Sequence, residues 1–69
     1  MSSDEESIIN HLPERQKAVV KYFGDRAISL ITEKLKDGYK IVSCTGDGVE
    51  MKQGFSYRYI SRGGSSYAL

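Results

Sequence analysis

Apolar residues at helical spacing open the chain. Three of them form one patch near its start: Ile8, Ile9 and Leu12. This patch predicts a short helix over residues 4–11. Ser3 and Glu6 have the spacing of a capping box, in which each side chain satisfies a backbone N–H of the first helical turn. The alternative for residues 1–12 is a flexible acidic arm, because chain termini are often disordered.

A longer amphipathic pattern follows Pro13, which suits the first position of a helix because its missing N–H needs no partner there. Apolar residues recur mostly at steps of three and four positions: Val19, Tyr22, Phe23, Ala27, Leu30, Ile31 and Leu35. They predict one long helix over residues 14–36 that buries a single face. Gly24 and Asp25 leave an alternative, in which a first helix ends before Gly24 and a second begins with Asp25 as its N-cap.

The second half of the chain is rich in β-branched and aromatic residues and predicts a small antiparallel sheet. The segments with strand patterns are residues 39–45, 55–62 and 65–69. Gly38 fits the left-handed position that ends a helix, and Gly63-Gly64 fits a two-residue hairpin connection. Residues 46–48 read as a hairpin turn, whereas residues 49–54 fit either a pairing strand or a wide loop.

These elements predict a single α+β domain over residues 1–69. One long amphipathic helix, with or without a short helix before it, packs on a three-stranded antiparallel β-meander. The predicted strands are apolar on both sides: Ile41 and Val42 lie on opposite faces of the first, and Tyr59 and Ile60 on opposite faces of the second. Because one helix covers only one face of a sheet, we expect the N-terminal helix, a second copy of the chain or a partner to cover the other.

Composition narrows the class of protein. The net charge is +1; after the acidic start, the remaining 63 residues carry ten basic and six acidic side chains, a balance of +4. This is far below the charge density of a dedicated nucleic-acid-binding protein. No apolar run reaches the roughly 20 residues that cross a membrane. With one cysteine, Cys44, and no secretory pattern at the start, we expect a cytoplasmic protein. Its small core favours oligomerisation.

Residues with catalytic chemistry are few and scattered. His11 is the single histidine and has no cysteine or carboxylate at ligand spacing, so we expect a helix-end role rather than metal or acid–base work. Cys44 lies inside a predicted strand, where thiols are seldom activated, and reads as a small core residue. The Gly46–Gly48 turn leads towards a strand rather than a helix, which argues against a phosphate loop. We therefore expect no enzyme, no metal and no cofactor.

An aromatic and basic hairpin is the best candidate for a binding surface. Aromatic rings beside Arg and Lys stack bases in small RNA-binding modules, and the same residue types anchor protein interfaces. The alternative is that the aromatic residues from Phe55 to Tyr59 face the helix and form the core. Arg58, Ile60 and Arg62 would then form the outer face. The candidate partner-binding residues are Val42, Lys52, Tyr57, Arg58, Tyr59, Ile60 and Arg62.

Together these features favour a small non-enzymatic protein-binding module: a regulator, adaptor or inhibitor that occupies a surface of a larger protein and forms homodimers. One alternative is a nucleic-acid-binding module that uses Lys52, Tyr57, Arg58, Tyr59 and Arg62. A further alternative is a structural subunit of an assembly. Salt separates the first two, because phosphate-driven binding weakens steeply with ionic strength and an apolar protein interface weakens much less.

Overall fold

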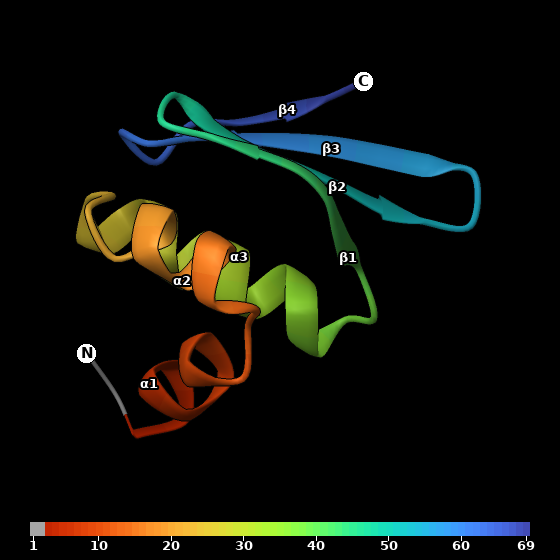
Figure 1. Cartoon of the computed structure of the whole chain (residues 1–69). Coiled ribbons are helices and arrows are strands. Elements are labelled where there is room, and N and C mark those ends of the chain that lie inside the picture. Colours follow the sequence, from red (N-terminus) through yellow and green to blue (C-terminus); the bar gives the residue numbers. More distant parts are fainter. Residues whose placement is uncertain (1–2) are drawn as a thin grey trace.

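Helices and strands form layers in the computed structural model, which describes residues 3–69 (Figure 1). The helices are α1 (Ser3–Asn10), α2 (Glu14–Val20) and α3 (Asp25–Lys36). The strands are β1 (Lys40–Thr45), β2 (Gly48–Gln53), β3 (Ser56–Ser61) and β4 (Ser66–Ala68). The strands form one antiparallel sheet in the order β1-β2-β3-β4. All three helices lie on the same side of it. The α+β class is therefore confirmed.

The predicted long helix over residues 14–36 is wrong, because the chain breaks between Val20 and Asp25 into α2 and α3. Gly24 is extended, with φ −66° and ψ 159°, and it is the N-cap in place of the expected Asp25. The Gly24 N–H donates to the carbonyl of Arg62 at 3.0 Å. The break therefore connects the helical layer to the end of β3, a long-range contact that periodicity in the sequence does not reveal.

The sheet has four strands rather than the predicted three, because residues 48–53 pair as β2 instead of forming a wide loop. All six residues of β2 pair with β3. Along β2, Val49 and Met51 are buried, whereas Glu50 and Lys52 point to the opposite side. This alternation gives β2 one apolar face and one charged face, and it sets the orientation of the whole sheet.

Of two predicted glycine-containing turns, the structure confirms the one at Gly38 and differs from the one at Gly63-Gly64. Gly38 has φ 104°, and the Tyr39 N–H donates to the Lys34 carbonyl at 3.0 Å, so α3 ends in the predicted left-handed cap. The β3–β4 connection is longer than the predicted two residues and runs over residues 62–65. Within it only Gly64 has a positive φ, of 96°.

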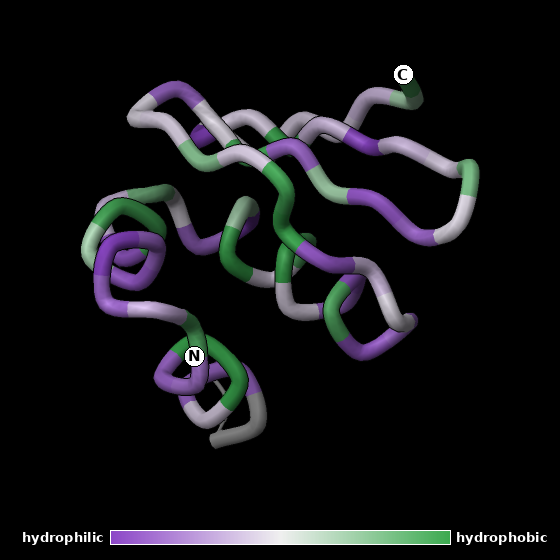
Figure 2. Tube along the Cα trace, turned by 45° about the vertical axis from the view of Figure 1, so that its right-hand side comes forward, coloured by the Kyte–Doolittle hydropathy of each residue, from purple (hydrophilic) through white to green (hydrophobic). Residues whose placement is uncertain are grey.

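The core lies between the helices and the inner face of the sheet, and apolar segments occur in both layers (Figure 2). The buried apolar side chains of the described residues are Ile9, Val20, Phe23, Ala27, Ile28, Ile31, Val49, Met51 and Ile60. The polar residue Thr32 is also buried in this core, and its hydroxyl donates to the Ile28 carbonyl at 2.8 Å. That bond satisfies a group that would otherwise be costly to bury.

The predicted short N-terminal helix is confirmed as α1. It packs against α3 and α2 on the side away from the sheet, with Ile9 buried (Figure 1). The capping box predicted at Ser3 depends on a side chain outside the described part of the structure. Because α1 lies on the helices, it is not the element that covers the second face of the sheet.

Candidate functional site

The face of the sheet opposite the helices, which we call the outer face, has no other described element over it (Figure 1). Strand pairing arranges its side chains in rows across the sheet. The lysine row consists of Lys40, Lys52, Tyr57 and Leu69. The glutamate row consists of Ser43, Glu50, Tyr59 and Tyr67. The two rows are about 7 Å apart, since residues two apart on a strand share a face.

Three tyrosine rings dominate the side of the outer face formed by β3 and β4. The rings of Tyr59 and Tyr67 are paired across the strands, with centroids 6.4 Å apart and an interplanar angle of 34°. The ammonium group of Lys52 lies 5.5 Å from the centre of the Tyr57 ring. Tyr57 is 37% exposed and Tyr67 is 54% exposed. These rings therefore form a partly open aromatic surface rather than part of the core.

Tyr59 is held in place by its position over Gly48. A Cβ atom at Gly48 would lie 2.6 Å from the Tyr59 hydroxyl oxygen and 2.5 Å from the carbonyl oxygen of Ile60. Only a residue without a side chain leaves room for this close approach. The ring thus covers the backbone of β2 at Gly48, which is buried.

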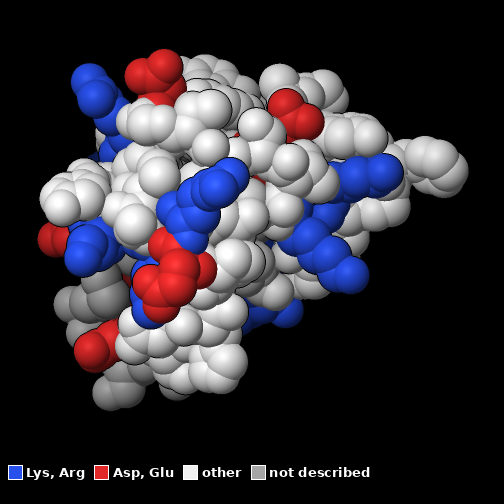
Figure 3. Space-filling view, viewed as in Figure 1, with Lys and Arg blue, Asp and Glu red and all other residues white. Residues whose placement is uncertain are grey.

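The other end of the outer face is basic. Lys40 and Lys52 are directly opposite each other on β1 and β2, and within residues 3–69 neither forms an ion pair. Half-exposed Val42 lies beside them, and the three residues line a shallow hollow of about 380 Å³. Basic side chains gather around the start of β1 and the β2–β3 hairpin, at the right of Figure 3. Like charges placed directly opposite each other are unfavourable unless something negative lies nearby.

The structure places four of the seven candidate residues on the outer face: Val42, Lys52, Tyr57 and Tyr59. Ile60 is fully buried against the helices, so its predicted outer position is wrong. Arg58 pairs with Met51 on the helix side and is half-buried. Arg62 lies beyond the end of β3, in the connection to β4.

The reason for this reversal is the alternation of β2. Ile60 pairs with buried Val49, so its side chain points towards the helices. Tyr57 and Tyr59 pair with Lys52 and Glu50, so their side chains point to the outer face. Tyrosine tolerates that position because its ring is apolar and its hydroxyl can reach water. Phe55, which was considered for the core, is instead fully exposed in the β2–β3 turn after Gly54, whose φ is 60°.

Lys40, Glu50, Tyr67 and Leu69 belong to the outer face but were not among the candidate residues. A signal for β2 was present in the sequence. The run from Val49 to Lys52 alternates between apolar and charged residues, which is the pattern of a half-buried strand. Assigning that run as a strand would have oriented Glu50 outward and, through pairing, its neighbours as well.

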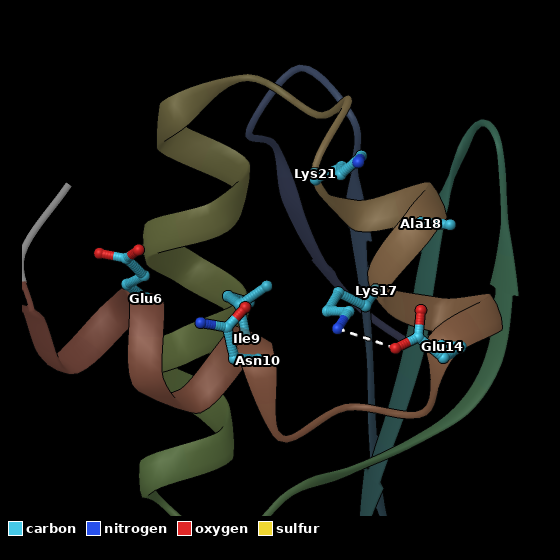
Figure 4. Close-up of a pocket in the computed structure, with 7 residues that line it drawn as sticks. All are labelled: Glu6, Ile9, Asn10, Glu14, Lys17, Ala18 and Lys21. Atoms are coloured by element: carbon cyan, nitrogen blue, oxygen red, sulfur yellow. Dashed lines mark ion pairs between the residues drawn. The ribbon is translucent and has the colours of Figure 1, made fainter.

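A second concave region lies between α1 and α2, as Figure 4 shows. It measures about 380 Å³, and its lining includes Ile9 and Ala18 together with both acidic and basic side chains. At its edge the Lys17 ammonium forms an ion pair with Glu14 at 3.0 Å. The charges of this cleft therefore partly neutralise each other, and no set of polar groups converges on one point in it.

The residues considered for catalysis have structural surroundings. His11 is exposed at the end of α1, where its Nδ1 lies 2.6 Å from the Ser7 carbonyl oxygen. Cys44 packs against the core, and burial raises the pKa of its thiol, which is the opposite of what a nucleophile requires. Among residues 3–69, no three His, Cys, Asp or Glu side chains lie together as potential metal ligands.

Comparisons with known proteins do not add a relative. The chain matches no protein-family model, no curated protein and no solved structure. None of the described helices has the length and apolar character needed to cross a membrane.

Proposed function

We propose that this protein is a small non-enzymatic binding module that docks on another protein through the outer face of its sheet. The observation that supports this most is the group of partly exposed rings, Tyr57, Tyr59 and Tyr67, on a face that no other described element covers. Tyrosine is enriched at the centres of protein interfaces because it offers a large contact area with little entropy to lose. A regulator, adaptor or inhibitor would use such a face to occupy a surface of its target.

The charges of the outer face favour a protein target over a nucleic acid. Glu50 lies in the middle of the face, directly opposite Tyr59, where a phosphate backbone would meet a carboxylate. Neither Arg58 nor Arg62 shares the face with the tyrosines, although both were needed for the nucleic-acid alternative. A surface with both signs of charge suits a protein partner, whose surface also carries both signs.

One observation keeps a nucleic-acid-binding function as the second candidate. The Lys52 ammonium over the Tyr57 ring places a cation beside a half-exposed aromatic face, which is an arrangement that binds single strands. Fluorescently labelled single-stranded RNA and DNA of mixed sequence test it directly. Binding that falls steeply between 50 and about 200 mM salt and is lost in Lys52→Ala would favour this candidate.

The protein-binding proposal is tested by paired affinity capture. Tagged wild-type protein and Tyr67→Ala are incubated at low micromolar concentration with the same nuclease-treated cell extract. We expect at least one protein bound by the wild type to be reduced about tenfold with Tyr67→Ala, because loss of an interface aromatic commonly weakens binding by 1.4 kcal/mol or more.

Tyr22→Ala is the matched control, since Tyr22 is also an exposed tyrosine, at 85%, but belongs to the helical layer. The captured protein should remain bound to Tyr22→Ala and to the wild type after a wash at raised salt. Equal capture by wild type and Tyr67→Ala, with loss in Tyr22→Ala, would move the binding surface to the helices and contradict the proposal.

A further inference from the structure

We propose that the outer face is self-complementary and binds a second copy of this chain, through a two-fold axis that crosses the strands between the lysine row and the glutamate row. This inference rests on the proposed function, because it names a partner for the same surface. The main support for this inference is the order of charges on the outer face, in addition to the apolar character of that face.

The central charges of the outer face form no ion pair within the part of the chain that the structure describes. Glu50 is half-buried between Ser43 and Tyr59, and within residues 3–69 it forms no ion pair. Lys52, two residues further along β2, contacts the Tyr57 ring but no carboxylate. The face thus presents one positive and one negative group about 7 Å apart on the same strand.

A two-fold axis between the rows brings each of these charges to its opposite. In such a face-to-face dimer the two β2 strands lie over each other in opposite directions, so Lys52 of one protomer faces Glu50 of its partner, and the reverse. The same operation places Tyr57 opposite Tyr59. Each central charge gains an opposite charge, and the repulsion between Lys40 and Lys52 is offset by a nearby carboxylate.

A dimer interface of standard size would involve a modest share of the molecular surface. A standard interface buries roughly 800 Å² on each partner. The exposed surface of the chain is 4522 Å², so such a contact would cover under a fifth of it. Packed sheets are about 10 Å apart, a separation that the tyrosine and lysine side chains can fill. A target that uses the outer face must then displace the second copy, so dimerisation and target binding compete.

Sedimentation equilibrium with four forms of the full chain tests this pairing: wild type, Glu50→Lys, Lys52→Glu and the double variant. The wild type should dimerise with a measurable dissociation constant in the micromolar range or below. Each single variant places like charges opposite each other twice per dimer, so each should weaken dimerisation by at least about tenfold. The double variant exchanges the two charges, restores both pairs and should return the constant to within about threefold of wild type.

Glu33→Lys is the charge-matched control, because Glu33 is exposed on α3 in the helical layer and should leave dimerisation unchanged. Circular dichroism confirms that each variant keeps its helices. A monomeric wild type at millimolar concentration overturns the inference, and so does a double variant as weak as the singles. Either result leaves the capture experiment with Tyr67→Ala unaffected, so failure of the dimer is distinguishable from failure of the proposed function.

Discussion

Gly48 shows how a residue without a side chain shapes the outer face. The Tyr59 ring lies across it, so a group that would otherwise project freely becomes a fixed part of the surface. Because the neighbouring Tyr67 ring contacts Tyr59, the order extends to β4, a strand of only three residues. The position of the Tyr59 ring on the outer face therefore depends on the absence of a side chain at Gly48.

Gly48→Ala should destabilise the protein by about 1–3 kcal/mol, the usual effect of overpacking. The added Cβ would lie 2.5 Å from the Ile60 carbonyl oxygen, and a backbone atom in a paired strand cannot rotate away. Gly46→Ala is the control, because a Cβ there meets nothing within 4 Å and φ at Gly46 is not positive. Urea unfolding of both variants checks the prediction, and equal stability of the two would contradict the placement of Tyr59.

Cys44 should be protected and poorly reactive. Burial raises the pKa of its thiol, so the folded state holds the proton to higher pH than the unfolded state does. The free energy of unfolding should therefore be unaffected well below the ordinary thiol pKa and should fall as the pH rises from about 8 to 9.5. Alkylation by iodoacetamide at pH 8 should be slower than in the urea-unfolded chain. A Cys44→Ala variant with the same alkaline loss of stability would assign that loss to other groups.

At the scale of elements, β2 decides which residues lie on the outer face. Its buried residues, Val49 and Met51, belong to one side, and pairing transmits that orientation to Ile60 on β3. When β3 is considered alone, Tyr57 and Tyr59 could lie on either face of the sheet. The polarity of side chains along a single strand is therefore insufficient to decide which face of the strand is buried. Pairing with a neighbouring strand decides it.

Ile60→Ala should reduce the free energy of unfolding by about 2–5 kcal/mol, since it leaves a cavity in a packed core. Val42→Ala removes apolar atoms from a half-exposed position on β1 and should change stability by less than about 1 kcal/mol. Chemical unfolding monitored by circular dichroism distinguishes them. A stable Ile60→Ala that loses only self-association would place Ile60 at an interface instead.

The sequence was sufficient for the fold class, for α1 and for the end of α3 at Gly38, because caps and periodicity are local properties. It was insufficient for the break at Gly24, where the apolar spacing continues almost in phase. That break depends on the hydrogen bond to Arg62, which lies far along the chain. The placement of the candidate residues was predicted only in part for the same reason: local composition singled out Tyr57 and Tyr59, and long-range pairing decided which face of the sheet they occupy.

At the scale of the whole molecule, no described element lies over the outer face of the sheet (Figure 1). The helices cover the inner face of the sheet, and α1 packs on the other two helices (Figure 1). The outer face carries partly exposed rings beside charges that form no ion pair with any described residue. A domain of 69 residues has little core area to spare, so covering this face would also stabilise it. This arrangement predicts that another protein covers the outer face, and that a second copy of the chain does so when no target is present.

Fluorine NMR of protein labelled with 3-fluorotyrosine tests this claim most directly, since the five tyrosines report on both layers. Single Tyr→Phe variants assign the resonances, which are then followed from low micromolar to millimolar concentration. We expect Tyr57, Tyr59 and Tyr67 to shift together with concentration, while Tyr22, exposed in the helical layer, remains unchanged. A shift of Tyr22 alone, or no shift of any tyrosine, would contradict self-association through the outer face.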